Sequence, residues 1–281
     1  MKSRKKNLLK SRSAYAAILL FLIITNLPIY WMYITSFKTQ EEVYGNPTWV
    51  PKSFTMQNYK EVLSAQQGRN FTFYLRNSLG ISSIVTAIML VLGTTSAYAF
   101  SHFRFRGSGL LLFLIIASRI IPPISLIIPY FKISETLHLR DTWFALIWVN
   151  VYLYLPFAVW LLKEFFDTVP AELPESARVD GCTNAQAFVR VVLPNSLPGI
   201  ASAAILVFLL SWNHFLFPLV LTSTEKARTI PVGVYDYVGD YFVNWGNMAA
   251  AGVIASMPAL IFLILFSRWL ISGLLSGALK E

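Results

Sequence analysis

Residues 172–194 of this 281-residue chain read ELPESARVDGCTNAQAFVRVVLP, a polar stretch that is set among much longer apolar ones. The chain as a whole is 56% hydrophobic and 13% charged, whereas about a quarter of the residues of a water-soluble globule are charged. The composition therefore predicts a membrane protein, in which the polar stretch forms a loop between membrane-spanning segments.

Six stretches with almost no ionisable side chains are long enough to cross a bilayer, because a helix needs about 20 apolar residues to span the hydrocarbon. In lipid the backbone must satisfy its own hydrogen bonds, and a helix does so within one segment. The sequence therefore predicts an all-α membrane protein with six transmembrane helices. These helices are expected near residues 14–36, 74–100, 108–131, 142–162, 199–222 and 247–271.

The N-terminus admits a second interpretation, because the basic residues 1–12 followed by an apolar run resemble a cleavable signal peptide. The apolar run is longer than the core of a signal peptide, and it lacks a small-x-small cleavage site. We therefore assign residues 14–36 to the first transmembrane helix.

The distribution of Lys and Arg predicts the orientation. If the N-terminus is cytoplasmic, the inside segments hold 13 Lys and Arg against 6 Asp and Glu, and the outside segments hold 8 against 8. Most of the excess lies in residues 1–13, next to the helix that usually dominates orientation. Both termini and the 172–194 loop are then expected on the cytoplasmic face of a bacterial cell membrane. The net charge of +9 is expected to face anionic lipid and not nucleic acid, for which no motif is visible.

Motifs for catalysis or cofactor binding are missing from the sequence. The three histidines, His102, His138 and His214, lie in different segments, and no metalloprotease or nucleophile-elbow motif occurs. No Gly-Lys dipeptide occurs either, so the chain has no phosphate-binding P-loop and cannot hydrolyse ATP by that route. We therefore expect neither an enzyme nor a metal or cofactor bound by this chain.

All 14 acidic residues fall outside the six expected spans. A proton-coupled carrier usually places carboxylates inside the bilayer, where they relay protons or bind the coupling ion. The sequence therefore favours a transporter that takes its energy from another protein, and a sodium site made of backbone carbonyls stays open as the alternative.

The first half of the polar loop is expected to form a short helix. Pro174 suits its first turn, because the missing N–H would have no partner there. Glu172 and Glu175 are favoured there by the positive end of the helix. Gly181 can adopt a positive φ and so end the helix.

The second half of the loop carries its own helix signals. Thr183 and Gln186 form a capping-box pattern for a second short helix, which Pro194 and Pro198 are expected to end. The loop is therefore expected to be a helix, a glycine elbow and another helix, held next to the membrane.

The spacing within the loop resembles a known signature. Glu175-Ser176-Ala177 is followed by three residues and Gly181, and then by nine residues and Val191-x-Leu193-Pro194. This order is similar to E-A-A-x₃-G-x₉-I-x-L-P, which marks the membrane subunits of ABC importers. Ser176 replaces the first alanine and Val191 replaces isoleucine, and both changes nearly keep size and character.

The resemblance covers most of the chain and points to the carbohydrate-uptake branch, similar to the inner-membrane subunit of maltose transporters. The fold that it implies is a type I ABC importer transmembrane domain. His214 stands where many relatives carry an acidic residue, and the chain ends in Ala-Leu-Lys-Glu where A-V-K-G is usual. The motifs that carry the resemblance are Asn77-Ser78, IIPPISLIIPYF at 120–131, LRDTWFALI at 139–147, LPFAVWLLKEFF at 155–166, SWNHFLFPLVLT at 211–222, ARTIPVG at 227–233 and RWLISGLLSGALK at 268–280.

The resemblance also implies a domain organisation. The expected parts are a basic cytoplasmic N-terminus at 1–13, the first transmembrane helix at 14–36, an extracytoplasmic segment at 37–70, a type-1 transmembrane domain of five helices at 71–267 with its cytoplasmic coupling loop at 163–199, and a cytoplasmic tail at 268–281.

The mechanism that the family implies needs several partners. An extracytoplasmic binding protein delivers a sugar, two permease subunits form the path, and two ATPase subunits carry ATP and Mg²⁺. The second permease subunit is either a second copy or a different chain, and the branch favours a different one. The loop helix is expected to dock on the ATPase and to transmit its closure. The expected contact residues are Glu172, Glu175, Ser176, Ala177, Asp180, Gly181, Leu193 and Pro194.

The substrate path is expected to involve Arg119, which lies 11 residues into the third span and hence roughly 16 Å deep. A charge at that depth is expected to face the interior of the bundle, where it contacts either sugar hydroxyls or a neighbouring helix. Trp212 and Asn213 place an aromatic face beside an amide, as a sugar site requires, and ordinary packing is the alternative. Asn150 and Tyr154 are the remaining candidates.

Two other features of the sequence each allow two interpretations. The aromatic segment Trp49–Tyr59 is either an interfacial belt on the outer surface that touches the binding protein, or a second ligand site. Gly273-x-x-x-Gly277 has the spacing of a helix-dimerisation motif, and a flexible tail is the plainer interpretation. For the whole chain, an ABC permease for a non-sugar solute such as a polyol or glycerol phosphate is the alternative function, and a secondary carrier is the next.

Overall fold

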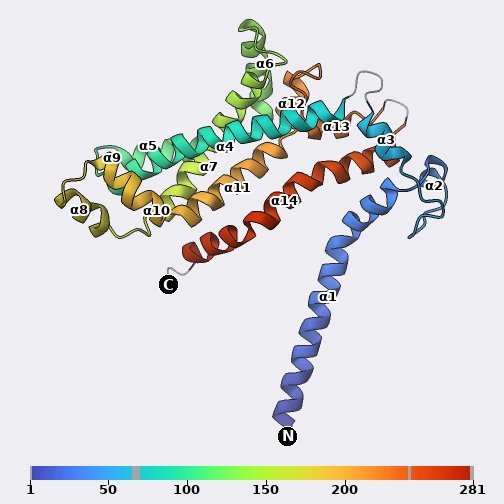
Figure 1. The fold of residues 1–281 in the computed structure, drawn as a ribbon, viewed down its shortest axis with the longest axis horizontal. Helices are drawn as coiled ribbons and strands as arrows, with labels where there is room; N and C mark the ends of the chain where they lie inside the picture. The colour runs from blue at the N-terminus through green and yellow to red at the C-terminus, as the bar shows by residue number, and fades with distance from the viewer. Residues whose placement is uncertain (1, 65–69, 240–241, 279–281) are drawn as a thin grey trace. The chain divides into compact units, whose positions relative to one another are not determined.

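The computed structural model describes residues 2–64, 70–239 and 242–278, with side chains between residues 14 and 267 of these ranges. Within them the regular secondary structure is helical, apart from a single strand-like bridge between Val238 and Val243, so the predicted all-α fold is confirmed (Figure 1). The elements are α1 (Lys2–Ser36), α2 (Gln40–Tyr44), α3 (Gln57–Leu63), α4 (Phe71–His102), α5 (Ser108–Ala117), η1 (Ser118–Ile120), η2 (Pro123–Leu126), α6 (Ile127–Thr136), α7 (Trp143–Phe166), α8 (Glu172–Val179), α9 (Asn184–Ala187), η3 (Phe188–Val192), α10 (Leu193–Asn195), α11 (Leu197–Trp212), α12 (Leu216–Leu221), α13 (Ile230–Tyr235) and α14 (Trp245–Ala278).

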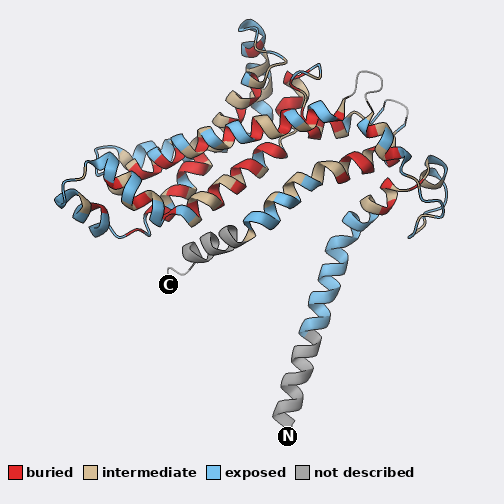
Figure 2. Cartoon of the chain, in the orientation of Figure 1, coloured by how far each residue is buried: buried red, intermediate tan, exposed pale blue. Residues whose placement is uncertain are grey.

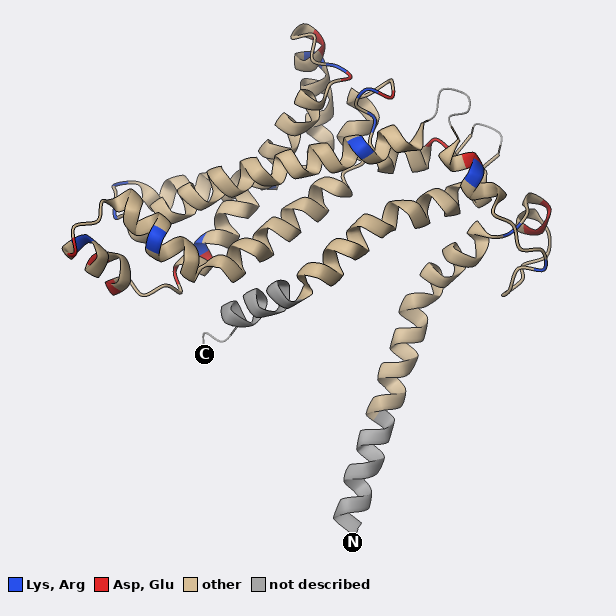
Figure 3. Ribbon diagram, in the orientation of Figure 1, with Lys and Arg blue, Asp and Glu red and all other residues tan. Residues whose placement is uncertain are grey.

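The described residues contain up to six candidate membrane spans. Four single helices are long and apolar enough: α1 from Ala14, α4, α7, and α14 as far as Ser267. Two bent pairs of helices pass the same test, α5 and η1 with η2 and α6, and the segment of α9 to α10 with α11. Charged side chains lie mostly in loops and at helix ends, as a bilayer requires (Figure 3). The predicted membrane fold is thereby confirmed.

The third expected helix, at 108–131, is not continuous. Its two halves, Ser108–Ile120 and Pro123–Thr136, are bent by 87° relative to each other. Ile121 and Pro122 have extended backbones at the break, because a proline disfavours helical backbone in the residue before it and has no N–H to donate. The expected helix at 108–131 is therefore broken at its prolines, and its two halves together count as one span at most.

The fifth expected helix, at 199–222, is also interrupted. The helix α11 ends at Trp212, and α12 begins only at Leu216. Pro218 would remove one helical hydrogen bond, and its ring would clash with the carbonyl four residues earlier. The polar residues Asn213 and His214 therefore lie in a break inside the apolar segment.

The two ends of the chain are helical beyond the expected spans. The backbone of the expected basic N-terminus belongs to α1 from Lys2 onward. At the other end α14 continues to Ala278, so the interpretation of Gly273 to Gly277 as a flexible tail is wrong. The side chains of residues 1–13 and 268–281 lie outside the described ones.

Contacts divide the chain into two compact units. Unit 1 comprises residues 1–67 and 234–254, and unit 2 comprises residues 68–233 and 255–281. The helix α14 contributes its first turns to unit 1 and its remainder to unit 2.

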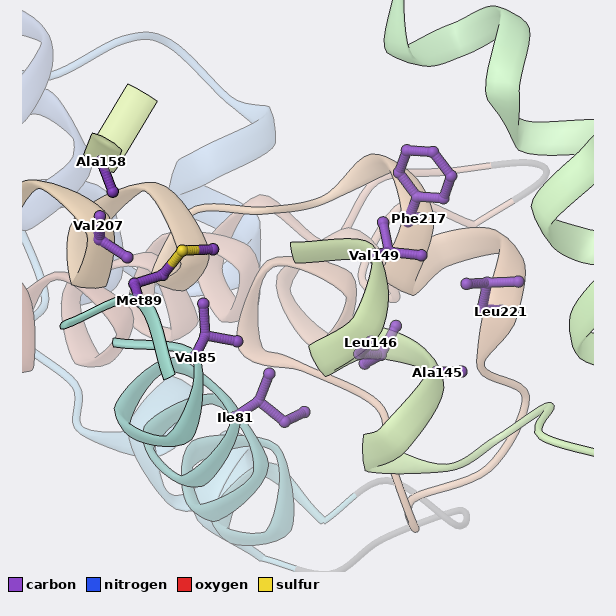
Figure 4. Packing of buried hydrophobic residues seen from close by; sticks show 10 residues of the cluster. All are labelled: Ile81, Val85, Met89, Ala145, Leu146, Val149, Ala158, Val207, Phe217 and Leu221. Carbon is purple, nitrogen blue, oxygen red and sulfur yellow. The ribbon is translucent and has the colours of Figure 1, made fainter. Parts of the chain in front are cut away.

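In unit 2 the helices α4, α7 and α11 pack side by side (Figure 1). Close approach of α4 and α7 depends on Gly80, because a Cβ there would lie 2.3 Å from the Trp143 ring. Side chains from α4, α7, α11 and α12 then interlock in one apolar core (Figure 4). The buried members of this core are Ile81, Val85, Met89, Ala145, Leu146, Val149, Ala158, Val207, Phe217 and Leu221.

A cluster of polar groups in unit 2 links the N-terminal parts of α4 and α7 to the segment before α13. The Asn77 amide donates to the carbonyls of Glu225 and Arg228 at 2.8 and 2.9 Å. Its oxygen accepts a hydrogen bond from the Trp143 indole at 3.1 Å. Three of the sequence motifs that carry the resemblance, around residues 77, 139–147 and 227–233, therefore meet in one place.

The loop between α6 and α7 is fixed to the segment after α12 by Asp141. Its carboxylate accepts hydrogen bonds from the backbone N–H groups of Ser223 and Thr224, both at 3.1 Å, and from the Thr224 hydroxyl. Partial burial acts to raise the pKa of Asp141, but these hydrogen bonds outweigh it and lower the pKa below its ordinary value. The φ of Asp141 is 59°, in the left-handed region that aspartate tolerates better than most residues.

Unit 1 joins the end of α1 to α2, α3 and the start of α14. The Asn58 amide donates to the carbonyls of Ser36 and Lys38 at 2.9 and 2.8 Å, which satisfies the end of α1. The Asn247 amide donates to Glu61 at 2.8 Å and links α14 to α3. The residues of α1 from 14 to 31 are all exposed, as for an apolar helix that packs against lipid or another chain (Figure 2).

Replacing Gly80 by leucine tests the close contact between α4 and α7. We expect overpacking to lower the free energy of unfolding by about 1–3 kcal/mol. This should appear as a lower midpoint in thermal unfolding of the detergent-purified protein. Gly109→Leu on α5 is the matched control, because a Cβ there has nothing within 4 Å. Equal midpoints for the two variants would contradict this account of the packing.

Asp141 predicts a pH dependence of stability with a defined sign. The pKa of Asp141 is lowered in the folded protein. Its contribution to the stability of the fold is therefore complete above the ordinary aspartate pKa of about 3.9, and it is lost as the pH falls through the pKa of the folded protein. Thermal midpoints of the wild type should therefore decrease on acidification below about pH 4 more steeply than those of Asp141→Asn. Parallel curves for the two proteins would show that the carboxylate contributes nothing.

Candidate coupling elbow and substrate-path residues

The polar loop forms a helical elbow, which we define as residues 172–195. Its first arm is α8, which ends as the glycine signal predicts. Gly181 has φ 90°, its N–H donates to the carbonyl of Arg178 at 3.0 Å, and the N–H of Cys182 donates to that of Ala177 at 2.9 Å. This pair of bonds is the Schellman motif, which satisfies the last carbonyls of a helix.

The second arm begins with the predicted capping box. The Gln186 N–H donates to the Thr183 hydroxyl at 3.3 Å, and the Thr183 N–H donates to the Gln186 side chain at 2.9 Å. Both ends of the turn between the arms are thus closed by hydrogen bonds. The turn contains only four residues, 180–183, and the Schellman motif and the capping box together limit its freedom.

The second arm is longer than expected. It runs through a π-helical segment at Phe188–Val192 and ends at Asn195, so the expectation that Pro194 ends it is wrong. The N–H of Leu193 donates to the carbonyl of Phe188, five residues earlier. This wider turn lets the chain continue although Pro194 has no N–H of its own. Pro198 lies in the first turn of α11, which is bent by 79° from the arm.

The second arm is packed into the ends of the membrane helices. The Phe188 ring lies 4.6 Å from the ring of Tyr98 on α4 and 6.3 Å from that of Phe166 on α7, centre to centre. Val192 is fully buried beside Phe166, and Ala203 brings α11 into the same cluster. The elbow is therefore anchored to α4, α7 and α11 together.

The first arm presents a mixed surface. Glu175 pairs with Arg178 at 3.7 Å on the exposed side of α8, a pair that contributes little to stability because both groups remain in water. Val179 is 88% exposed and Leu173 is 44% exposed, although both are apolar. The sequence analysis predicted no role for these two residues. The available signal was that both are apolar residues within a charged segment. Of the predicted contact residues, Glu172, Glu175, Ser176, Asp180, Gly181 and Pro194 are exposed, and Ala177 and Leu193 are half-buried.

Gly181 is required here by its backbone conformation. A Cβ at this position would meet nothing within 4 Å in the chain, but its φ of 90° is strained for any other residue.

A polar cavity of about 820 Å³ separates α8 from the end of α4. On its wall the Ser101 hydroxyl donates to Asp167 at 2.6 Å, and the Lys163 ammonium donates to the same carboxylate at 2.5 Å. These bonds connect the end of α4 to the end of α7 behind the elbow. The first arm is thus held away from the helix ends, while the second arm is packed against them.

Two of the predicted substrate-path residues gather around His214. The Asn150 amide donates to the carbonyl of Leu146 at 2.6 Å, and its oxygen lies 3.1 Å from Nδ1 of His214. The ring of Tyr154 lies 5.9 Å from that of His214, centre to centre. Tyr154 and His214, with Asn213, line an otherwise apolar hollow of about 490 Å³. Sequence reasoning noted His214 as a departure from relatives but did not predict its partner.

Trp212 and Asn213 do not form a joint site. The Trp212 side chain is 2% exposed, stacks on Phe208 and donates from its indole to the carbonyl of Ala255. Asn213 donates to the carbonyl of Leu209 and caps α11. Packing accounts for every contact of Trp212 that the structure provides, whereas Asn213 keeps an exposed side chain at the hollow.

Arg119 lies on η1, at the break of the third span. Its guanidinium is 5.5 Å from the centre of the Phe157 ring, in cation–π geometry. The residue is exposed on this chain and does not line the hollow around His214. The expectation that it faces the interior of the bundle stays a prediction, and the Phe157 ring on α7 supports contact with a neighbouring helix.

Comparison with known proteins places most of the chain in one family. Residues 89–276 match the family model described as binding-protein-dependent transport system inner membrane component. The trehalose transport system permease protein of Mycobacterium tuberculosis is 36% identical over 273 residues, which cover 96% of this chain and 98% of that protein. The trehalose/maltose transport system permease protein of Thermococcus litoralis is 35% identical over 277 residues, with 98% and 99% coverage.

Solved structures show a similar fold. A bacterial ABC transporter involved in the import of the polysaccharide alginate contains a chain that matches with a TM-score of 0.78 and 22% identity, covering 91% of this chain and 95% of that one. A chain of the MetNI methionine ABC transporter matches with a TM-score of 0.58 and 18% identity, covering 71% and 94%. These likenesses confirm the fold of a type I importer transmembrane domain.

The capping box gives a prediction for the rigidity of the elbow. Thr183→Ala should destabilise the start of the second arm by about 1 kcal/mol, because the backbone N–H of Gln186 loses its acceptor. Hydrogen exchange at the backbone of residues 184–187 should then become several-fold faster, whereas Thr183→Ser keeps the hydroxyl and should exchange like the wild type. Unchanged exchange in the alanine variant would show that the cap does not hold the second arm.

Proposed function

The chain belongs to the family of binding-protein-dependent transport system inner membrane components, and from that premise we propose that it is a permease subunit forming half of the membrane path for a sugar or oligosaccharide. It is a transport component and not an enzyme, and the energy comes from an ATPase on a separate chain. The observation that carries the substrate class is its identity of 35–36% over nearly its full length to permeases named for trehalose and maltose.

The polar residues of the hollow support a sugar as the transported solute. A sugar needs directional hydrogen-bond partners beside an aromatic face. Asn213 and His214 supply the polar groups, and the ring of Tyr154 supplies the face. We assign these residues, together with Asn150 behind His214, to the substrate path. Arg119 is a further candidate at the broken third span, and Trp212 has the role of fixing α11.

Energy enters through the elbow. The exposed face of α8 meets the ATPase subunit, with Glu175 in a charged contact and Leu173 and Val179 as apolar ones. Glu172, Ser176, Ala177, Asp180 and Gly181 belong to the same contact, and Leu193 and Pro194 support it from the second arm. Because the two arms are closed by hydrogen bonds, the elbow moves as a rigid body when the ATPase closes.

The helix α11 connects the elbow with the substrate path. It begins at Leu197, directly after the second arm, and ends at Trp212, directly before Asn213 and His214. With 16 residues it is about 24 Å long at 1.5 Å per residue. A displacement of the elbow therefore reaches both His214, just after α11, and Asn150, on α7, and in this way reaches the hollow when ATP is used.

The partners follow from this mechanism. We assign ATP and Mg²⁺ to two ATPase subunits, a second and different permease chain to the other half of the path, and delivery to an extracytoplasmic binding protein. A solved alginate transporter contains such a protein, described as periplasmic and bound to an alginate pentasaccharide. The exposed apolar length of α1 between residues 14 and 31 supports burial in lipid or against the second permease chain.

The orientation and the domain limits belong to the same proposal. Both termini lie in the cytoplasm of a bacterial cell, with residues 1–13 at the inner membrane surface and residues 37–70 outside. The five-helix domain extends over residues 71–267 and includes the coupling loop at 163–199, and the tail at 268–281 reaches toward the ATPase. The family match at 89–276 supports the position of this domain.

A glycoside of glycerol is the second candidate solute. The sulfoquinovosyl glycerol transport system permease of Agrobacterium fabrum is 35% identical over 254 residues, covering 90% of this chain. Thermal-shift screening of the associated binding protein against sugars, oligosaccharides, glycosides of glycerol, polyols and glycerol phosphate distinguishes the two. Stabilisation by a sugar or oligosaccharide alone supports the first candidate, and stabilisation by a glycoside of glycerol alone supports the second. Stabilisation by a polyol or glycerol phosphate alone contradicts both.

Two substitutions test the coupling role of the elbow. Glu175→Lys reverses the charge offered to the ATPase, and Gly181→Asp strains the positive φ that holds the arms at their angle. We expect both variants to insert into the membrane and to lose most sugar uptake in proteoliposomes that contain the complete transporter. ATP hydrolysis by the same preparations should no longer respond to the loaded binding protein.

The control is Glu135→Lys, which reverses a similarly exposed carboxylate that pairs with Arg140 at 3.4 Å. It lies on α6, far in sequence from the elbow, and should transport like the wild type. Wild-type uptake by either elbow variant would exclude this loop as the coupling site.

A further inference from the structure

Unit 1 contains an apolar cavity of about 510 Å³ that the transport mechanism does not use. This volume lies within the range of about 300–1,000 Å³ that is usual for small-molecule sites. The cavity is bounded by the end of α1, by α2 and the loop after it, and by the first turns of α14. Its apolar wall includes Pro28, Trp31, Met32, Trp245, Met248 and Ala249.

A buried cation lies at one end of this cavity. Lys38 is 3% exposed, and its ammonium lies 4.7 Å from the centre of the Trp31 ring. It donates one hydrogen bond, to the carbonyl of Thr48 at 2.5 Å, although an ammonium has three donors. Among the described residues no carboxylate lies within ion-pair distance of it. A cation removed from water in this way favours an anionic ligand group.

A carboxylate also lies on the cavity wall, outside ion-pair distance of Lys38. The carboxylate of Glu42 accepts hydrogen bonds from the Thr48 hydroxyl at 2.5 Å and from the backbone N–H of Lys52 at 3.0 Å. These bonds, the Thr48 one first, lower the pKa of Glu42, so the group is ionised at neutral pH. The polar end of the cavity therefore offers one positive and one negative charge, together with the Thr35 hydroxyl.

The surroundings of the cavity are those of a membrane–water interface. The exposed apolar run of α1 ends at Trp31, which is itself on the cavity wall. In the loop after α2, Trp49, Val50 and Phe54 are 60–69% exposed, and the Trp49 ring packs edge-on against Trp31 at 5.5 Å. Tryptophans gather where a bilayer meets water. This agrees with the expectation of an interfacial belt at Trp49–Tyr59.

We propose that this cavity binds one phospholipid with a zwitterionic amine headgroup, phosphatidylethanolamine. Its phosphate would meet Lys38, its ammonium would meet Glu42, and one acyl chain would lie along Met32 and Met248. A purely anionic headgroup would bring no positive group to Glu42 and would be repelled by it. A sugar would find few directional partners in these walls, because Thr35, Lys38 and Glu42 are the only polar residues other than tryptophan among the described residues that line them.

Native mass spectrometry of the complete transporter, purified in detergent and stripped of lipid, tests the headgroup. Phosphatidylethanolamine and phosphatidylglycerol are added at equal molar ratio, and the lipids retained per complex are counted. We expect retention of phosphatidylethanolamine over phosphatidylglycerol by at least about fivefold, the effect of one charge pair, and loss of this preference in Glu42→Gln. Equal retention of both lipids by the wild type would overturn the proposal.

A second pair of variants tests the site itself. Ala249→Phe fills the cavity, whereas Ala17→Phe adds the same side chain to the exposed face of α1. The first variant should retain one phosphatidylethanolamine fewer per copy of this chain, and the second should match the wild type. If Ala249→Phe assembles and keeps the full number of lipids, the cavity is not the site. If it does not assemble, the comparison of the wild type with Glu42→Gln decides.

Discussion

The contact of Phe188 with Tyr98 and Phe166 determines what the elbow can do. A loop that touched the membrane helices only through flexible side chains would absorb a displacement from outside. Here the centre of the Phe188 ring lies 4.6 Å from that of Tyr98 and 6.3 Å from that of Phe166. Val192 is buried one helical turn further along the second arm. The elbow therefore moves together with the ends of α4, α7 and α11, because closely packed side chains transmit strain.

The placement of polar residues supports the same mechanism. In the apolar segments a buried polar group is costly unless it is paired, and Asn150 meets this requirement by bonding to Leu146 and His214. His214 lies in the break after α11, and that helix begins at the elbow. The polar pair thus lies at one end of the helix and the site of energy input at the other. A short rigid helix is sufficient to couple them.

The sequence predicted the features that depend on local chemistry. The elbow followed from Gly181 and the capping box, because helix ends are determined by a few neighbouring residues. The spans of α4 and α7 were predicted to within about four residues, as their apolar length required. The π-helical segment at Phe188–Val192 was missed, because no local signal marks it.

Features that depend on tertiary contacts could not be predicted. Asn150 and His214 are 64 residues apart in the chain, and only the packing of α7 against α11 and α12 brings them together. The prolines of the third span explain why its helix breaks, but the bend of 87° between its two halves was not predicted. Trp212 fitted the composition of a sugar site, yet its indole bonds to the backbone of Ala255.

The central claim is that the elbow lies against an ATPase chain on the cytoplasmic side. Cys182, the single cysteine of the chain, lies next to Gly181 in the turn between the arms. A short thiol-to-amine crosslinker applied to membrane vesicles should join it to the ATPase subunit, and Cys182→Ser should give no product. If the complete transporter yields no such product, or if a membrane-impermeant thiol reagent modifies Cys182 from outside intact cells, the account is contradicted.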